Sequence, residues 1–135
     1  MRSVDVFFYG LFMDAAVLRE QQVTPLNPRP ALVEGFQLRI GNRASLLPQA
    51  GARVYGMLFA LTHSELERLY VGPELESYRP EAVLARTLQG EAVPALCYNL
   101  PTAPSPDERN QRYAARLQRV LRSLNFPEEY VASVH

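Results

Sequence analysis

The chain has 135 residues, of which 47% are hydrophobic and 21% are charged. This length and composition predict one globular domain with a single core, and they exclude a disordered chain. The 14 basic residues balance 14 acidic ones, and every basic residue is an arginine. Because lysine is absent, enzymes that need a Schiff-base lysine or a P-loop lysine are excluded.

Cysteine and histidine are too scarce for several kinds of site. Cys97 is the one cysteine, and the two histidines are His63 and His135. A disulfide framework is therefore excluded, and neither a zinc site nor a Ser-His-Asp triad is expected. Cys97 is expected to be a small buried strand residue. We expect a reducing, cytoplasmic setting. No signal-peptide pattern and no run of roughly 18 apolar residues is present, so no membrane contact is expected.

The first half of the chain alternates short strands with a helix. The apolar run over residues 4–9 predicts a buried strand that ends in a turn at Gly10. A short helix is expected over 13–21, and three prolines then predict an extended loop. The strands that follow are expected over 31–40, 44–47 and 54–61. Gly35 predicts a bulge or bend in the first of them, and residues 48–51 predict a turn between the second and the third.

Two capping boxes mark helix starts in the second half. Thr62 and Glu65 predict a helix that runs to about residue 70, and Ser105 and Glu108 predict a longer one that ends at Pro127. The strands between them form a hairpin and are expected over 79–88 and 92–99. About six short strands with inserted helices, without βαβ alternation, indicate an α+β fold with a bent mixed sheet or a small β-barrel.

The last helix carries a stripe of arginines opposite its apolar face: Arg109, Arg112, Arg116, Arg119 and Arg122. Such a stripe can bind phosphates, so nucleic-acid binding is one interpretation. The zero net charge, the acidic first turn and the absence of aromatic residues on that face favour a solvated surface instead. Nucleic acid is therefore not an expected partner.

Four segments of the chain carry short motifs in a fixed order. Tyr9-Gly10 follows the first strand, as in the pattern Tyr-Gly-Ser/Thr-Leu, and residues 54–61 fit V-x-G-x-L-(F/Y)-x-L. The helix and loop before Tyr78 fit the pattern L-x-x-x-E-G…Y-x-R-x-x-V, and residues 92–98 fit a strand that ends in A-x-x-Y. Together they resemble the gamma-glutamylcyclotransferase-like superfamily, of which the chain is identified as a divergent member.

The resemblance implies one domain over residues 1–135, with a core over 4–99 and a helical extension over 105–135. The implied fold is a small mixed β-barrel of about six strands with flanking helices and a pocket at its mouth. The implied reaction releases 5-oxoproline, because the amine of a γ-glutamyl group attacks its own γ-carbonyl, and it needs no metal or organic cofactor. In the family, backbone amides of the Tyr-Gly turn hold the substrate and a glutamate takes a proton from the amine.

The chain departs from the family pattern at that glutamate. Counted back from Tyr78, the Glu-Gly pair falls on Val71-Gly72, and valine cannot accept a proton. Glu76 and Glu74 lie in the same loop and are the candidate replacement bases. The residues carried over for substrate binding are Tyr9, Gly10, Leu11, Phe12 and Tyr78.

Two functions therefore stay open. The first is cyclotransferase chemistry on a small γ-glutamyl or related amino-acyl substrate. The second is a non-catalytic relative whose pocket binds a small carboxylate-bearing metabolite or a protein partner. Arg43 and Arg79 are candidates to pair with an acidic ligand, although Arg79 alternatively aligns a strand or pairs with a nearby glutamate.

Overall fold

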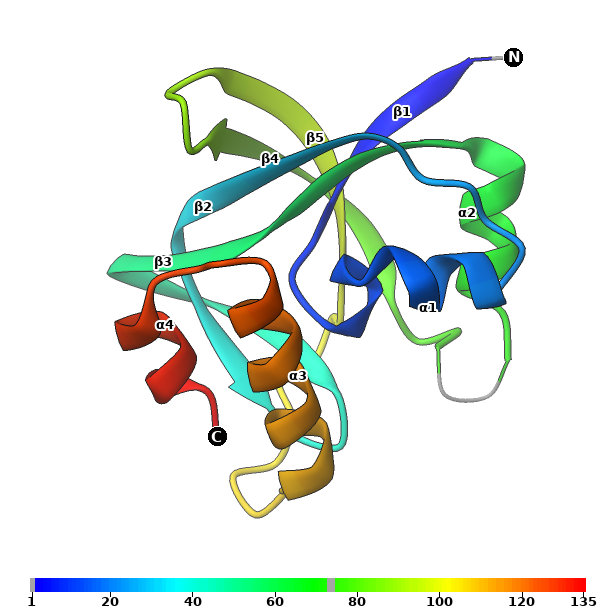
Figure 1. Cartoon of the computed structure of the whole chain (residues 1–135). Helices are drawn as coiled ribbons and strands as arrows, with labels where there is room; N and C mark the ends of the chain where they lie inside the picture. Colours follow the sequence, from blue (N-terminus) through cyan, green and yellow to red (C-terminus); the bar gives the residue numbers. More distant parts are fainter. Residues whose placement is uncertain (1, 73–74) are drawn as a thin grey trace.

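Five strands form a closed barrel in the computed structural model, which describes residues 2–72 and 75–135 (Figure 1). The order around the barrel is β1-β3-β2-β4-β5. Neighbouring strands pair antiparallel except β1 and β5, which are parallel. The expected α+β class and small mixed barrel are confirmed, with five strands where about six were expected. The strands are β1 (Ser3–Phe8), β2 (Leu26–Ile40), β3 (Ala44–Thr62), β4 (Arg79–Thr87) and β5 (Ala92–Asn99).

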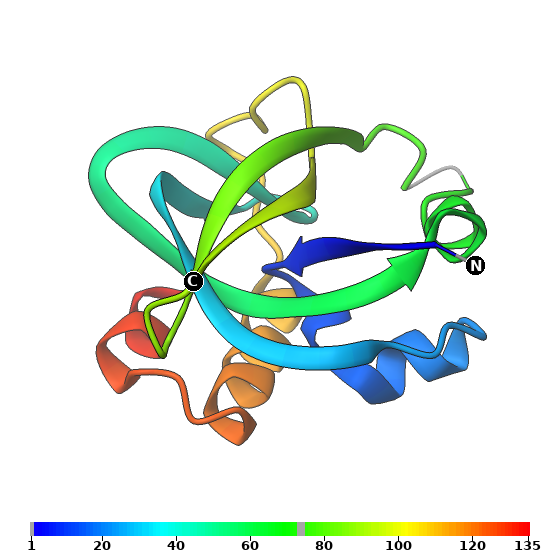
Figure 2. The same ribbon diagram turned by 90° about the horizontal axis from the view of Figure 1, so that it is seen from above.

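Helices cover the outside of the barrel. Figure 2 shows that α1, α3 and α4 lie on one side of it, whereas α2 follows β3 near the N-terminus. Among the described residues, no helix is both long enough and apolar enough to cross a bilayer. The helical elements are the 3-10 turn η1 (Leu11–Met13), α1 (Ala15–Glu20), α2 (His63–Leu69), α3 (Gln111–Ser123) and α4 (Glu128–Ser133).

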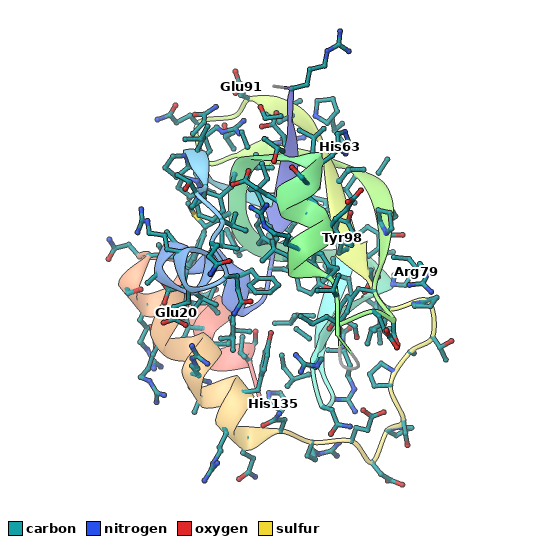
Figure 3. The ribbon with its side chains drawn as sticks, turned by 90° about the vertical axis from the view of Figure 1, so that its right-hand side faces the viewer. Glu20, His63, Arg79, Glu91, Tyr98 and His135 are labelled. Atoms are coloured by element: carbon teal, nitrogen blue, oxygen red, sulfur yellow. The ribbon has the colours of Figure 1, made fainter. Side chains whose placement is uncertain are left out.

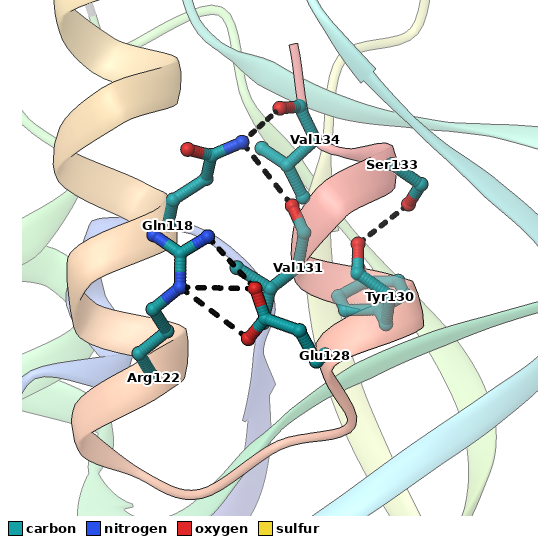
Figure 4. Close-up of polar contacts among 7 residues, drawn as sticks. All are labelled: Gln118, Arg122, Glu128, Tyr130, Val131, Ser133 and Val134. Atoms are coloured by element: carbon teal, nitrogen blue, oxygen red, sulfur yellow. Dashed lines mark hydrogen bonds and ion pairs between the residues drawn. The ribbon is translucent and has the colours of Figure 1, made fainter.

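The C-terminal helix α4 is held against α3 by polar contacts (Figure 4). The side-chain amide of Gln118 donates to the carbonyls of Val131 and Val134, at 3.2 and 2.7 Å. Arg122 pairs with Glu128 at 2.9 Å. These contacts join the two helices into one layer over the barrel.

β2 begins earlier than the sequence predicted, because two prolines lie within the strand rather than in a loop. The carbonyl of Pro30 accepts a hydrogen bond from the N–H of Leu88, at 3.2 Å. The backbone nitrogen and carbonyl of Pro30 therefore face away from β3, so the missing N–H of proline interrupts no β2–β3 hydrogen bond. Pro28 lies where the register of this ladder shifts, between Leu26 and Arg29.

The turn expected over 48–51 is wrong, because these residues form an irregular part of the single long strand β3. Glu34 pairs with Arg53, but Phe36 pairs with Pro48, so the register shifts between the two pairs. The expected bulge at Gly35 is confirmed by this shift. Gly35 has a φ of 87°, which favours glycine.

The second capping box does not start a helix. α3 begins after Asn110, whose side chain accepts from the N–H of Tyr113 at 3.0 Å. The carboxylate of Glu108 does accept from the N–H of Ser105, at 2.8 Å, but it also accepts from the N–H of Asn42, at 3.2 Å. The box therefore ties a turn to the β2–β3 connection, and the helix starts later than predicted.

The first capping box is confirmed at the start of α2. Glu65 accepts from the N–H of Thr62 at 2.9 Å and from the N–H of Thr24 at 3.0 Å. Burial raises the pKa of Glu65, but these backbone hydrogen bonds outweigh it, so the pKa is lower than in the unfolded chain. Glu65 therefore joins α2 to the connection between α1 and β2.

Glu65→Gln is expected to lower the free energy of unfolding at pH 7 by about 1–2 kcal/mol, because a neutral amide accepts weaker hydrogen bonds. A lowered folded-state pKa gives stabilisation that is present above the unfolded pKa and is lost as pH falls through the folded pKa. Urea unfolding at pH 7 and at pH 3 measures this effect. The difference in unfolding free energy between Glu65→Gln and wild type should be smaller at pH 3 than at pH 7. Glu67→Gln, an exposed change on the same helix, should leave the unfolding free energy unchanged at both pH values. An equal difference for Glu65→Gln at both pH values would contradict the role of the charge.

Candidate functional site

A cavity of about 230 Å³ lies where β1 ends, beside the loop that follows α2 and the start of α3. The β2–β3 connection, α1 and β5 complete its wall. The residues predicted to bind substrate all line it, and they come from two separate parts of the chain: Tyr9, Gly10, Leu11, Phe12 and Tyr78.

Gly10 allows the turn after β1 to lie directly against α3. The N–H of Leu11 donates to the hydroxyl of Tyr113, at 3.3 Å. A Cβ at Gly10 would lie 2.5 Å from that hydroxyl oxygen, so a side chain there would displace the ring. The N–H of Met13 donates to the carbonyl of Gly10, at 3.0 Å, and closes η1. The turn is thus fixed by Tyr113, which lies in the helical extension.

Two buried tyrosines of the site donate to backbone carbonyls. The hydroxyl of Tyr9 donates to the carbonyl of Tyr98 at 2.8 Å, and that of Tyr78 donates to the carbonyl of Ala44 at 2.5 Å. Burial raises the pKa of both Tyr9 and Tyr78 well above the usual range. Both hydroxyls therefore stay protonated near neutral pH and act as donors, not as bases.

An aromatic wall, made of Phe8, Phe12, Tyr70 and Tyr98, forms one side of the cavity. Tyr70 stacks on Tyr98 with ring centroids 4.0 Å apart. The ring of Phe12 meets Tyr70 edge-on at 5.9 Å, and Phe8 meets Phe12 in the same way at 5.9 Å. Figure 3 shows Tyr98 beside α2. Three rings of the wall, those of Phe12, Tyr70 and Tyr98, are only half-buried, so apolar surface is available to a ligand.

Arg43 is the only charged side chain among the described residues that line the cavity. Burial raises the pKa of Tyr78 and Tyr113, and the positive charge of Arg43 opposes this rise at both residues. The guanidinium therefore lies within electrostatic reach of both hydroxyls. A permanent cation beside the Tyr113 hydroxyl suits a carboxylate, whereas the proton of Tyr78 is already donated to the carbonyl of Ala44.

Neither candidate base belongs to the described lining of the cavity. Glu76 is exposed and does not line the cavity. Its backbone carbonyl accepts from Arg79, which is itself exposed and points outward in Figure 3. Val71, where the sequence motif predicts the family's glutamate position, is also exposed, and Glu74 lies outside the described residues. The part of the lining that the structure describes thus contains no carboxylate and no imidazole.

The sequence did not single out Tyr70, Tyr98 or Tyr113 as site residues. Tyr98 ends the A-x-x-Y motif, which is the one signal that marked it. Tyr113 belongs to the apolar face of a helix, and periodicity predicts that such a residue is buried but not which backbone group it meets. The hydrogen bond to Leu11 spans 102 residues of sequence, which a local pattern does not report.

Cys97 is buried in β5, as expected. Burial, with a smaller contribution from the Glu81 carboxylate, raises the pKa of its thiol to about 12. The thiol is therefore protonated near neutral pH and a poor nucleophile. Among the residues that the structure describes, no group of three histidine, cysteine or acidic side chains is placed to hold a metal ion.

Comparison with solved structures shows the same fold in other proteins. A structure titled gamma-glutamyl cyclotransferase is 18% identical, with a TM-score of 0.79 over 98% of this chain and 88% of its own. An uncharacterised human protein is 20% identical, with a TM-score of 0.78 over 100% of this chain and 89% of its own. An AIG2-like protein from mouse is 20% identical, with a TM-score of 0.65 over 80% of this chain and 83% of its own.

Comparison with sequences gives the family. No curated protein sequence matches the chain. The model of the family described as gamma-glutamyl cyclotransferase, AIG2-like, matches residues 6–117, a range that includes both the turn after β1 and Tyr113. Since this range is most of the chain, the protein belongs to the gamma-glutamyl cyclotransferase, AIG2-like family.

Proposed function

We propose that the protein is a gamma-glutamylcyclotransferase-like enzyme that cyclises a small γ-glutamyl or related amino-acyl compound and releases 5-oxoproline. The observation that supports it is the cavity itself, which gathers the Tyr9–Phe12 turn, Tyr78 and Arg43. Arg43, together with the hydroxyl of Tyr113, suits the carboxylate of such a substrate. Family membership supports the class of reaction.

The reaction needs orientation and one proton transfer. The neutral amine nitrogen of the substrate attacks its γ-carbonyl carbon, the new C–N bond closes a five-membered ring, and the old amide C–N bond breaks. The proton lost by the attacking nitrogen ends on the leaving amine. Because both reacting groups belong to one molecule, a cavity that holds the folded-back conformation supplies much of the rate gain.

Tyr113 is placed to support this chemistry as a donor. Its oxygen accepts from the N–H of Leu11, so its own proton is available to a second acceptor. Burial raises its pKa, and the hydroxyl is therefore protonated near neutral pH. A carboxylate or a developing oxyanion in the cavity is the acceptor that we propose.

The proton acceptor must come from outside the described lining, because arginine stays protonated and the buried tyrosines stay neutral. Glu74 and Glu76 are the proposed bases. For Glu76 to serve, its exposed side chain must turn toward the cavity.

A second function is favoured by the chemistry of the described lining, which contains no carboxylate and no imidazole. Counted back from Tyr78, the family's glutamate position falls on Val71, so we expect no base at that position. A non-catalytic relative that binds a small carboxylate-bearing metabolite in the same cavity fits this observation.

Release of 5-oxoproline from a panel of γ-glutamyl amines and peptides separates the two functions. The first predicts 5-oxoproline formation above the rate without protein, measured by mass spectrometry. Matched α-glutamyl compounds are the control, because they have no γ-amide to break. Binding by calorimetry without release supports the second function. If no compound of the panel binds and none releases 5-oxoproline, both functions would be contradicted.

A small molecule, rather than nucleic acid, is the proposed partner, and the arginine stripe, of which Arg109 lies before α3 and not in it, supports this choice. Arg122 is paired with Glu128, and Arg109 donates to the carbonyls of Pro106 and Glu108. Two arginines of the stripe therefore already bind groups of the same chain. The cytoplasmic setting stays a prediction from the chain's single cysteine.

A further inference from the structure

The cavity lining combines polar groups with the aromatic wall, and different elements supply the two. Arg43 comes from the β2–β3 connection, and Tyr113 comes from α3. The aromatic wall comes from the end of β1, from η1, from the end of α2 and from β5. A ligand that fills the cavity therefore meets the cation and the hydroxyl of Tyr113 as well as the rings of the wall.

The rings of the wall support one another and still expose surface. Tyr98 covers one face of Tyr70, with the two rings only 8° from parallel. Phe12 meets Tyr70 at 88°, in an edge-to-face contact. Aromatic rings prefer these two arrangements, so the wall is ordered without a ligand. A further ring that packs against it would find the same kinds of contact.

Charge restricts what can pack there. The carboxylate of a γ-glutamyl group is suited to Arg43, which is the only charged side chain among the described lining residues. A leaving group with a second carboxylate would bring that charge against the aromatic wall, and burying it without a partner is costly. The wall therefore favours an uncharged leaving group.

We propose, on the basis of the proposed function, that the aromatic wall holds the leaving group and that the preferred substrates are γ-glutamyl amides of amines that carry an aromatic ring and no second charged group. The step is the one already written: the ring C–N bond forms, the amide C–N bond breaks, and the ring-bearing amine departs with the proton. Phe12, Tyr70 and Tyr98 are the specificity-determining residues.

Three substrates test the proposal: γ-glutamyl benzylamide, γ-glutamyl methylamide and γ-glutamylphenylalanine. We expect kcat/KM for 5-oxoproline release to be about 10-fold or more higher for the benzylamide than for the methylamide. The phenylalanine compound, which carries a second carboxylate, should fall below the benzylamide. The dissociation constants, measured by calorimetry, should follow the same order.

Variants connect this preference to the wall. Phe12→Leu should reduce the preference for benzylamide over methylamide to less than about 3-fold, since the ring contact is lost while apolar volume is kept. Thermal unfolding checks that the variant is folded. If Phe12→Leu does not fold, Tyr70→Leu is the second variant. Leu84→Ala, at a residue that is 64% exposed on β4, is the matched control and should keep the preference.

The outcomes separate the two proposals. Release from all three substrates at similar kcat/KM would overturn the aromatic preference and leave the proposed function standing. No release from any of them would overturn the proposed function. In that case, similar dissociation constants for the three compounds would overturn the aromatic preference as well, whereas tighter binding of the benzylamide would support it.

Discussion

Replacing Glu74 and Glu76 together with glutamine is expected to lower the rate of 5-oxoproline release by about 100- to 10,000-fold, the usual contribution of a general base. An amine attacks only in its neutral form, and it must lose a proton as the ring closes. The described lining offers arginine, which stays protonated, and tyrosines whose pKa is raised by burial. We therefore propose a carboxylate of the loop before β4 as the base.

The measurement is steady-state kinetics of 5-oxoproline release for the double variant and for each single variant. The loss should appear in kcat, with KM changed little, and the single variants should show which glutamate carries it. Glu91→Gln, an exposed change in the β4–β5 hairpin, is the matched control and should match wild type. A double variant that keeps more than about a third of the wild-type kcat would exclude both glutamates as the base.

The pH profile of the wild-type enzyme gives an independent check of the same base. A carboxylate base is active only when ionised, so kcat should fall as pH drops through its pKa. The rate that remains in the double variant should lose this acid limb. An acid limb that persists in the double variant would assign the titration to another group.

The fold could be predicted from the sequence because its signals are local or carried by ordered motifs. The Thr62–Glu65 capping box and the glycine bulge at Gly35 each depend on residues that are near in sequence or directly paired across β2 and β3. The second box shows the limit of such signals. Glu108 has the right spacing to Ser105, but its carboxylate also binds the N–H of Asn42, 66 residues away.

The candidate site could be predicted only in part, for a similar reason. The turn after β1 has a sequence signature, so Tyr9 to Phe12 could be assigned to substrate binding before the structure was known. The residues that complete the cavity have none: Arg43 follows a strand, and Tyr113 fits the apolar face of a helix. Closure of the barrel and packing of α3 bring them to the turn. The charge and the aromatic wall of the site are therefore tertiary properties.

Gly56 in β3 shows why one position in the motif over residues 54–61 has to be glycine. β1 and β3 are adjacent, with Phe8 paired to Met57. A Cβ at Gly56 would lie 2.2 Å from the carbonyl oxygen of Phe8 and 2.8 Å from a ring carbon of Phe7. The side chain of Phe7 is fully buried, so neither neighbour has room to move. The glycine is needed for space between two strands.

Gly56→Ala is accordingly expected to lower the free energy of unfolding by about 3 kcal/mol, the upper end of the usual cost of overpacking a core, because one of the clashing atoms belongs to the backbone. Urea unfolding measures the change. Gly51→Ala is the matched control in the same strand: its φ is 81° but its Cβ would meet nothing within 4 Å, so it should cost only about 1 kcal/mol.

Combining Gly56→Ala with Phe7→Leu separates the two contacts that make up the clash. Leucine removes the ring contact but leaves the carbonyl of Phe8 in place, so no rescue is expected, and the added cavity should lower stability further. Full recovery by the double variant would show that the ring alone sets the spacing of β1 and β3. Because Phe8 directly precedes the Tyr9–Phe12 turn, Gly56→Ala should also weaken ligand binding in the protein that remains folded. Gly51→Ala should leave binding unchanged, since Gly51 is not among the described residues that line the cavity.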